Sequence, residues 1–288
     1  MYADELASAP AALGAKPTSA RVESVALGLL AADRVGRAFT AVIEQTVGEH
    51  YSSNASVATL ALLSAGSLRP RDLSAAIGLP TPTVSRTIDR LEASNDVTRE
   101  GRQVADDGRA VLIRLTRRGR RQERAIAEAL VASAGSLSAS IDEVAARFDG
   151  GPGGLTAPPE PTATGLSLAL AQAGIAAGGV LRSAADDVAG ALTLCALVAD
   201  GGESRPSLIS EQVGLTSGGT TKVLDRLESD GAIERCFGTS TDRRAVVLTL
   251  TTSGRQRVEE MVVRLEPHLP RLQRLFASLG EYVARKAS

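Results

Sequence analysis

The sequence repeats itself once, and this repeat constrains the fold more than any other feature. Residues 69–99 align with residues 205–235 at an offset of 136, with 10 identities in 31 positions. Residues 107–121 align with residues 242–256 at an offset of 135, with 8 identities in 15. Because a repeated segment is one structural unit used twice, we expect two similar units. The length of 288 residues is enough for two domains, each with its own core.

A segment rich in glycine and proline separates the two repeats. Residues 150–161 contain four glycines and four prolines, a mixture that neither a helix nor a central strand tolerates. The sequence therefore predicts four parts: a flexible N-terminal segment (1–20), a first domain (21–149), a linker (150–165) and a second domain (166–288).

Each repeat carries the pattern of two helices followed by a hairpin. In the first repeat, apolar residues at helical spacing stop at Gly78, which predicts the end of a short helix. Thr81 is expected to cap the next helix, with Pro82 in its first position. Residues 97–115 then show two extended stretches around a polar loop, as in a two-stranded hairpin. The second repeat follows the same pattern, with Thr216 as the expected cap.

Long helical patterns flank both repeats, so the expected fold class is mainly α with small β wings. These patterns cover residues 25–47, 117–148, 166–185 and 253–283, the last with a break expected at Pro267 or Pro270. Residues 165–181 form an apolar stretch of 17 residues that is short for a bilayer span, so a deeply buried helix is favoured and no membrane partner is expected.

Positive charge is concentrated in the repeats, although the formal net charge of the chain is only -1. Residues 69–121 have a net charge of +5 and residues 205–257 a net charge of +2, whereas the rest of the chain has a net charge of −8. This distribution is typical of domains that meet phosphates. On the second helix of each repeat, hydroxyl and cationic side chains could contact DNA bases and phosphates: Thr81, Thr83, Ser85, Arg86 and Arg90, and then Ser217, Thr221, Lys222 and Arg226.

Other function classes lack their sequence signatures. Two cysteines and two histidines are too few for a disulfide framework or a zinc site, so no metal or other cofactor is expected. No catalytic motif is present, which argues against an enzyme. The same low cysteine count predicts a reducing, cytoplasmic location. The start of the chain has acidic residues where a secretory signal needs basic ones, which argues against export.

The repeated motifs resemble those of the multiple-antibiotic-resistance regulator (MarR) family of winged-helix transcription factors. The resemblance rests on residues 83–92 and 107–116 in the first half, and on residues 221–228 and 242–251 in the second. It implies a sequence-specific, double-stranded DNA-binding regulator without a cofactor, with recognition helices in major grooves and wing arginines in minor grooves. Repression is the family's commoner mode. Arg109 and Arg244 match the family's wing arginine, and Arg243 lies beside the second of these.

The chain departs from this family in carrying two such units. The economical explanation is an intrachain pseudo-dimer, in which two winged helix-turn-helix domains are joined by long dimerisation-type helices. Such a pseudo-dimer does not need two identical halves, so its DNA site can have two different half-sites. These half-sites would lie about 10 base pairs apart. Further homodimerisation stays open, as does DNA contact by the second unit. The alternative function is a winged-helix protein-interaction module that has lost DNA binding in one or both halves.

Relatives of this family often respond to a small-molecule effector held near the long helices. By position, the candidate ligand-binding residues are Phe39, His50 and Tyr51, near the end of the first long helix. Ordinary core packing is the alternative explanation for all three.

Overall fold

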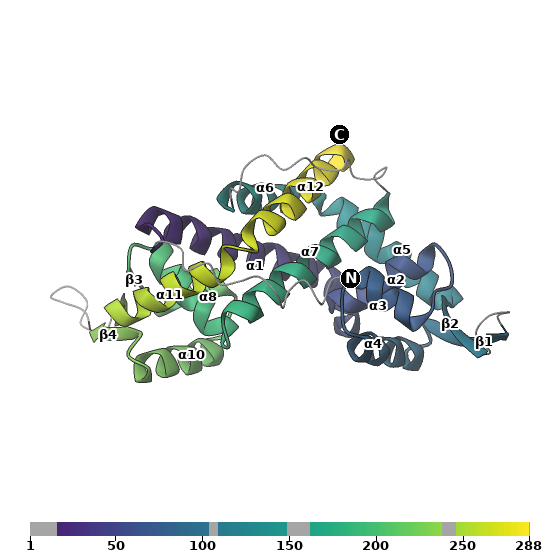
Figure 1. Cartoon of the computed structure of the whole chain (residues 1–288), viewed down its shortest axis with the longest axis horizontal. Helices are drawn as coiled ribbons and strands as arrows, with labels where there is room; N and C mark the ends of the chain where they lie inside the picture. Colours follow the sequence, from purple (N-terminus) through teal and green to yellow (C-terminus); the bar gives the residue numbers. More distant parts are fainter. Residues whose placement is uncertain (1–15, 104–108, 149–161, 238–245, 288) are drawn as a thin grey trace.

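The chain is mainly helical, with two small antiparallel sheets (Figure 1). The computed structural model describes residues 16–103, 109–148, 162–237 and 246–287. The first half contains α1 (Ser19–Val47), a 3₁₀ turn η2 (Glu49–Tyr51), α2 (Asn54–Ser64), α3 (Pro70–Ile77), α4 (Thr81–Ala93), α5 (Arg117–Ala132) and α6 (Ala134–Arg147). The second half contains α7 (Ala163–Ala184), α8 (Val188–Ala199), α9 (Pro206–Val213), α10 (Ser217–Ser229), α11 (Thr252–Leu265) and α12 (Leu269–Ala287).

Each half carries one antiparallel hairpin, and the two hairpins lie at opposite ends of the molecule (Figure 1). The first sheet pairs β1 (Val97–Gln103) with β2 (Arg109–Leu115). The second sheet has the strand order β3-β5-β4, built from β3 (Glu203–Ser204), β4 (Ile233–Phe237) and β5 (Val246–Leu250). The repeat predicted both hairpins. It did not predict β3, whose counterpart in the first half is a single bridge between Leu68 and Ile113.

The turn between the paired helices follows the same geometry in both halves. α3 ends at Gly78 with φ 77°, and α9 ends at Gly214 with φ 68°. Both values lie in the left-handed region that favours glycine after a helix. The predicted helix end at Gly78 is therefore confirmed.

The predicted caps are right in the second half and wrong in the first. Thr216 caps α10, because its Oγ1 accepts a hydrogen bond from the Gly219 amide at 3.1 Å. In the first half the cap position belongs to Pro80, and Thr81 is the first helical residue. The reason is that the Pro80 carbonyl already accepts the amides of Thr83 and Val84, at 2.9 and 3.2 Å.

The long helical patterns are confirmed in type but not everywhere in continuity. The break at Pro267 is confirmed, since α11 ends at Leu265 and α12 begins at Leu269. Residues 117–148 form two helices rather than one. α5 ends at Ala132 and α6 begins at Ala134, with Ser133 between them. The helix expected at 166–185 begins earlier, at Ala163, so part of the predicted linker is helical.

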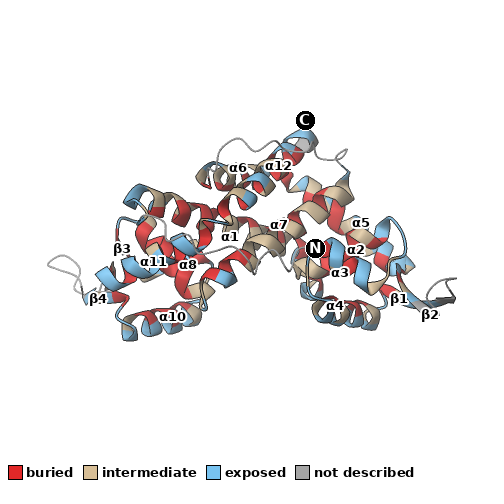
Figure 2. Ribbon diagram, in the orientation of Figure 1, coloured by how far each residue is buried: buried red, intermediate tan, exposed pale blue. Residues whose placement is uncertain are grey.

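Helices from the two halves pack against one another and share one hydrophobic core (Figure 2). α1 packs on α8, α7 packs on α2, and α12 packs on α6. The large buried side chains include Phe39 and Phe148 from the first half and Phe276 from the second. Since each long helix contacts the opposite half, neither half buries its apolar surface alone.

The apolar helix α7 is less buried than its sequence suggested. Among the described residues, it is the one helix whose length and mean hydropathy of 1.5 would permit a bilayer span, and 39% of that apolar window is buried in the protein. The sequence predicted a deeply buried helix; part of the α7 surface instead lines a cavity, described below.

A glycine repeats where the hairpin returns to the long helices. Thr116 and Thr251 cap α5 and α11, and each accepts a hydrogen bond from a glycine amide in the first turn, Gly119 or Gly254. A Cβ on Gly119 would lie 2.0 Å from the Asp96 carbonyl oxygen, and one on Gly254 would lie 2.1 Å from the Ala232 carbonyl oxygen. Only glycine fits this close approach without moving the backbone.

Candidate nucleic-acid interface

The two candidate DNA-contacting helices, α4 and α10, lie along the same edge of the molecule (Figure 1). Each helix turns one apolar side to the core and an exposed side away from it (Figure 2). The buried side of α4 consists of Val84, Thr87, Ile88 and Leu91. The polar member of this set, Thr87, donates a hydrogen bond to the Thr83 carbonyl at 3.0 Å.

The α4 residues singled out from sequence differ in exposure. Thr81, Arg86 and Arg90 are exposed, whereas Thr83 and Ser85 are half-buried. Within the described part of the chain, neither Arg86 nor Arg90 forms an ion pair with a carboxylate. Both guanidinium groups are therefore available for an external anion.

The corresponding residues of α10 are all exposed, but one cation is occupied. Ser217, Thr221, Lys222 and Arg226 face solvent. The Thr221 hydroxyl donates to the Ser217 carbonyl at 3.0 Å. Arg226 forms an ion pair with Asp187, so the exposed side of α10 offers fewer unpaired cations than that of α4.

The structure places the wing arginines only in part. Arg109 begins β2, opposite Gln103 in β1, and its side chain lies outside the described structure. Arg243 and Arg244 lie outside the described residues altogether.

Sequence reasoning missed an ionic cluster that joins each candidate helix to its hairpin. Arg99 of β1 pairs with Asp89, at 2.5 Å, and with Glu92, both at the end of α4. In the second half, Arg235 pairs with Asp225 at 2.7 Å and Glu228 at 2.5 Å. All three positions repeat at an offset of 136, and this repetition is the sequence signal that could have revealed the cluster. The shared acidic motif therefore holds the helix on the hairpin, and its hydrogen bonds and opposite charges raise the pKa of Arg99.

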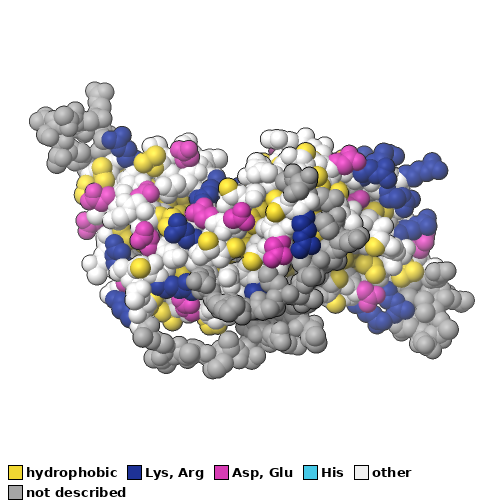
Figure 3. Space-filling view, turned by 90° about the horizontal axis from the view of Figure 1, so that it is seen from above, with side chains coloured by type: hydrophobic (Ala, Val, Ile, Leu, Met, Phe, Trp, Pro, Cys, Tyr) yellow, Lys and Arg dark blue, Asp and Glu magenta, His cyan; other side chains and the backbone are white. Residues whose placement is uncertain are grey.

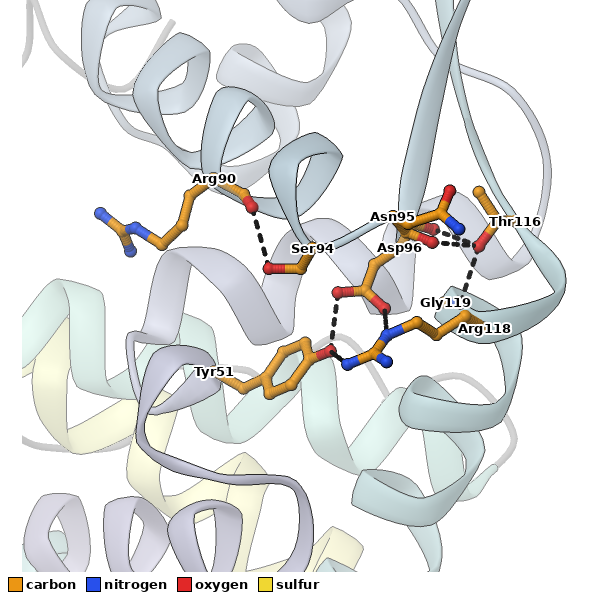
Figure 4. Close-up of polar contacts among 8 residues, drawn as sticks. All are labelled: Tyr51, Arg90, Ser94, Asn95, Asp96, Thr116, Arg118 and Gly119. Carbon is orange, nitrogen blue, oxygen red and sulfur yellow. Dashed lines mark hydrogen bonds and ion pairs between the residues drawn. The ribbon is translucent and has the colours of Figure 1, made fainter.

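A buried polar network lies just beyond the same end of α4 in the first half (Figure 4). The Tyr51 hydroxyl donates to Asp96 at 2.6 Å, and Arg118 Nε lies 3.1 Å from the other carboxylate oxygen. Tyr51 and Asp96 are fully buried. Burial, together with the hydrogen bond to Asp96, raises the pKa of Tyr51 above its ordinary value. The network joins η2, the start of the hairpin and the start of α5.

The face of the molecule away from α4 and α10 carries mixed charge except at one end. Figure 3 shows this face, on which acidic and basic side chains alternate along the middle. Basic side chains gather at the end that holds α5 and the first hairpin. The N-terminal turns of α5 carry four exposed arginines, Arg117, Arg118, Arg120 and Arg121.

A cavity of about 370 Å³ lies where the long helices of the two halves meet. Mainly apolar residues line it, from α1, α7 and α12, among them Phe39, Leu170 and Phe276. Its charged lining residues are Asp33, Glu44 and Arg37. Of the three ligand candidates, Phe39 alone lines this cavity; His50 lines an open surface hollow, and Tyr51 belongs to the buried network.

One hydrogen bond connects α1, and an equivalent one connects α7, to the paired helices of the opposite half. Arg37 of α1 donates to the Gln212 carbonyl at 2.7 Å, at the end of α9. Gln172 of α7 donates to the Ala76 carbonyl at 3.1 Å, at the end of α3. The donors are 135 positions apart and the acceptors 136, so the repeat applies to these crossing contacts as well.

No protein-family model and no curated protein matches the chain. Among the described residues, no three His, Cys, Asp or Glu side chains group together as metal ligands. The features of the chain that bear on its function are therefore the repeat, the exposed cations and the placement of α4 and α10.

Proposed function

We propose that this protein is a DNA-binding transcriptional regulator, acting as a repressor in the cytoplasm, whose two winged helix-turn-helix domains form a pseudo-dimer within one chain. α4 and α10 are the recognition helices that enter major grooves, and the arginines of the two hairpins reach minor grooves. One observation carries the proposal: the same helix-turn-helix and hairpin unit occurs twice, with exposed cations along the same edge. Exposed arginine, lysine and hydroxyl groups on a helix suit base edges and phosphates.

The packing of the long helices supports a dimer-like arrangement. α6 and α12, which end the two halves, pack against each other, and each first helix packs on the opposite half. Such exchange between halves is typical of intertwined two-fold assemblies. Because the halves differ in sequence, the DNA site that they contact is expected to have two unlike half-sites.

The wing arginines give the direct test of this function. Arg109→Ala and Arg244→Ala are each expected to weaken binding to a duplex enriched from a random library by about tenfold. Each is also expected to reduce the slope of log affinity against log salt by about one, since one phosphate or groove contact is lost. Fluorescence anisotropy over a salt series measures both quantities.

A matched control and the alternative function belong to the same experiment. Arg271→Ala changes an arginine on α12, a helix that lies away from α4 and α10 (Figure 1), and should leave DNA affinity within about twofold. If the wild-type chain enriches no duplex, the protein-interaction module becomes the better description. Unchanged affinity in both wing variants would contradict the assigned role of the hairpins.

We also propose that the cavity between the long helices holds a small-molecule effector, an apolar cation. Asp33 and Arg37 are paired at 2.7 Å, so Glu44 leaves the lining with an excess negative charge. Burial raises the pKa of Asp33, with Arg37 partly opposing this, so a second cation nearby would favour the ionised carboxylate. Arg37 also donates to Gln212 of the second helix pair. A ligand that draws Asp33 from Arg37 would therefore act on the position of α9.

Tetraphenylphosphonium is a suitable probe for this cavity. We expect it to raise the melting temperature of the wild-type protein and to bind at least tenfold more weakly to the Asp33→Asn variant, because a desolvated charge pair is lost. Salicylate, an aromatic anion, serves as the matched comparison and should not stabilise the protein. Tighter binding of the anion, or equal binding to both proteins, would refute the cation preference. Isothermal titration calorimetry gives the affinities.

A further inference from the structure

The two recognition helices end differently, and the difference lies at one repeated arginine. Arg90 and Arg226 occupy equivalent places, 136 positions apart, in the shared motif at the end of α4 and α10. Arg90 is exposed and has no carboxylate partner within the described residues, although Glu49 lines the same surface hollow. Arg226 is also exposed, but its guanidinium is ion-paired with Asp187.

The partner of Arg226 sits at a cap position that the first half fills with serine. Ser53 is the cap of α2, and its Oγ accepts a hydrogen bond from the Ser56 amide at 3.2 Å. Asp187 is the cap of α8, but its side chain makes no capping bond. Aspartate is a good cap residue, but the Asp187 carboxylate pairs with Arg226 instead of capping α8.

We propose that Asp187 masks Arg226 from DNA, so that the first unit supplies the stronger phosphate contact and the second unit the weaker one. This inference rests on the proposed function, since it assigns unequal roles to the two units of the same interface. A phosphate that approaches Arg226 must compete with a carboxylate already in place, and the pair presents no net charge. At Arg90 a phosphate meets an uncompensated guanidinium.

The masking predicts unequal effects of the same substitution in the two halves. Using the duplex enriched by the wild-type chain as the probe, we expect Arg90→Gln to weaken binding about fivefold and to lower the salt slope by about one. Arg226→Gln should change affinity by less than about twofold, because that charge is already neutralised. Asp187→Ser should tighten binding about three- to fivefold, since it frees Arg226 and restores the cap seen at Ser53.

A double variant separates the freed arginine from any general effect of charge. In the Asp187→Ser, Arg226→Gln protein the gain should disappear, whereas Asp186→Ser, which removes the neighbouring acid, should give less than about half of it. Asp187→Asn provides a second way to remove the charge if the serine variant does not fold.

The outcomes distinguish this inference from the proposed function. Equal losses for Arg90→Gln and Arg226→Gln overturn the masking while leaving DNA binding intact. The same holds if neither Asp187 variant gains affinity. A wild-type chain that enriches no duplex overturns the proposed function itself, and the masking with it.

Discussion

Replacing Gly119 by alanine is expected to lower the free energy of unfolding by about 3 kcal/mol, which is at the upper end for overpacking. The new methyl group would lie 2.0 Å from the Asp96 carbonyl oxygen and 3.2 Å from the Leu115 side chain. The nearer atom belongs to the backbone and cannot move aside as a side-chain end could. The start of α5 must therefore shift away from the hairpin, and the capping bond from Gly119 to Thr116 is strained.

Urea denaturation followed by circular dichroism measures this loss, with Gly179→Ala as the matched control. Gly179 lies inside α7, and a Cβ there would meet no atom within 4 Å. That substitution should stabilise the protein by about 0.5–1 kcal/mol, the ordinary gain in helix propensity. Gly254→Ala should repeat the loss in the second half. An unfolding midpoint for Gly119→Ala equal to that of the control would contradict the close approach.

Replacing Asp96 by alanine is expected to cost about 3 kcal/mol, because it leaves the Tyr51 hydroxyl buried without its acceptor. Tyr51 lies in η2, which follows the first long helix, and Asp96 follows α4. The substitution should therefore also loosen α4 relative to the long helices. Hydrogen exchange of α4 amides should rise together with the loss of stability measured in urea.

An exposed aspartate in the same unit gives the comparison for Asp96. Asp89 pairs with Arg99 at 2.5 Å but lies at the surface, so Asp89→Ala should cost less than about 1 kcal/mol. Adding Tyr51→Phe to the Asp96→Ala chain should recover part of the loss, since the stranded hydroxyl is removed. If the double variant were no more stable than Asp96→Ala alone, the cost would not come from the unsatisfied hydroxyl.

Features that repeat in the sequence were the most predictable ones. The helix ends at Gly78 and Gly214 need a left-handed backbone, and glycine at both positions of the repeat made this visible. The cap at Thr81 was predicted wrongly because Pro80 closes the first turn with its own carbonyl, a choice that two neighbouring prolines leave ambiguous in sequence.

Contacts between the halves could not be derived from local patterns. Arg37 gives no sign in sequence that it reaches the carbonyl of Gln212, because the contact depends on how α1 crosses the second half. The same limit applies within the first half, where Tyr51 was predicted as a ligand contact and donates to Asp96, 45 positions away. Periodicity reports which side of a helix is apolar, but it does not report which distant helix covers that side.

The core shared by the two halves bears on how such a regulator would respond to its own abundance. A regulator assembled from separate subunits loses operator occupancy steeply on dilution, since its dimer dissociates and occupancy then falls with the square of subunit concentration. Here α6 and α12 belong to one polypeptide and pack against each other at any concentration. If the protein has the proposed function, operator occupancy would depend hyperbolically on protein concentration, down to a few copies per cell.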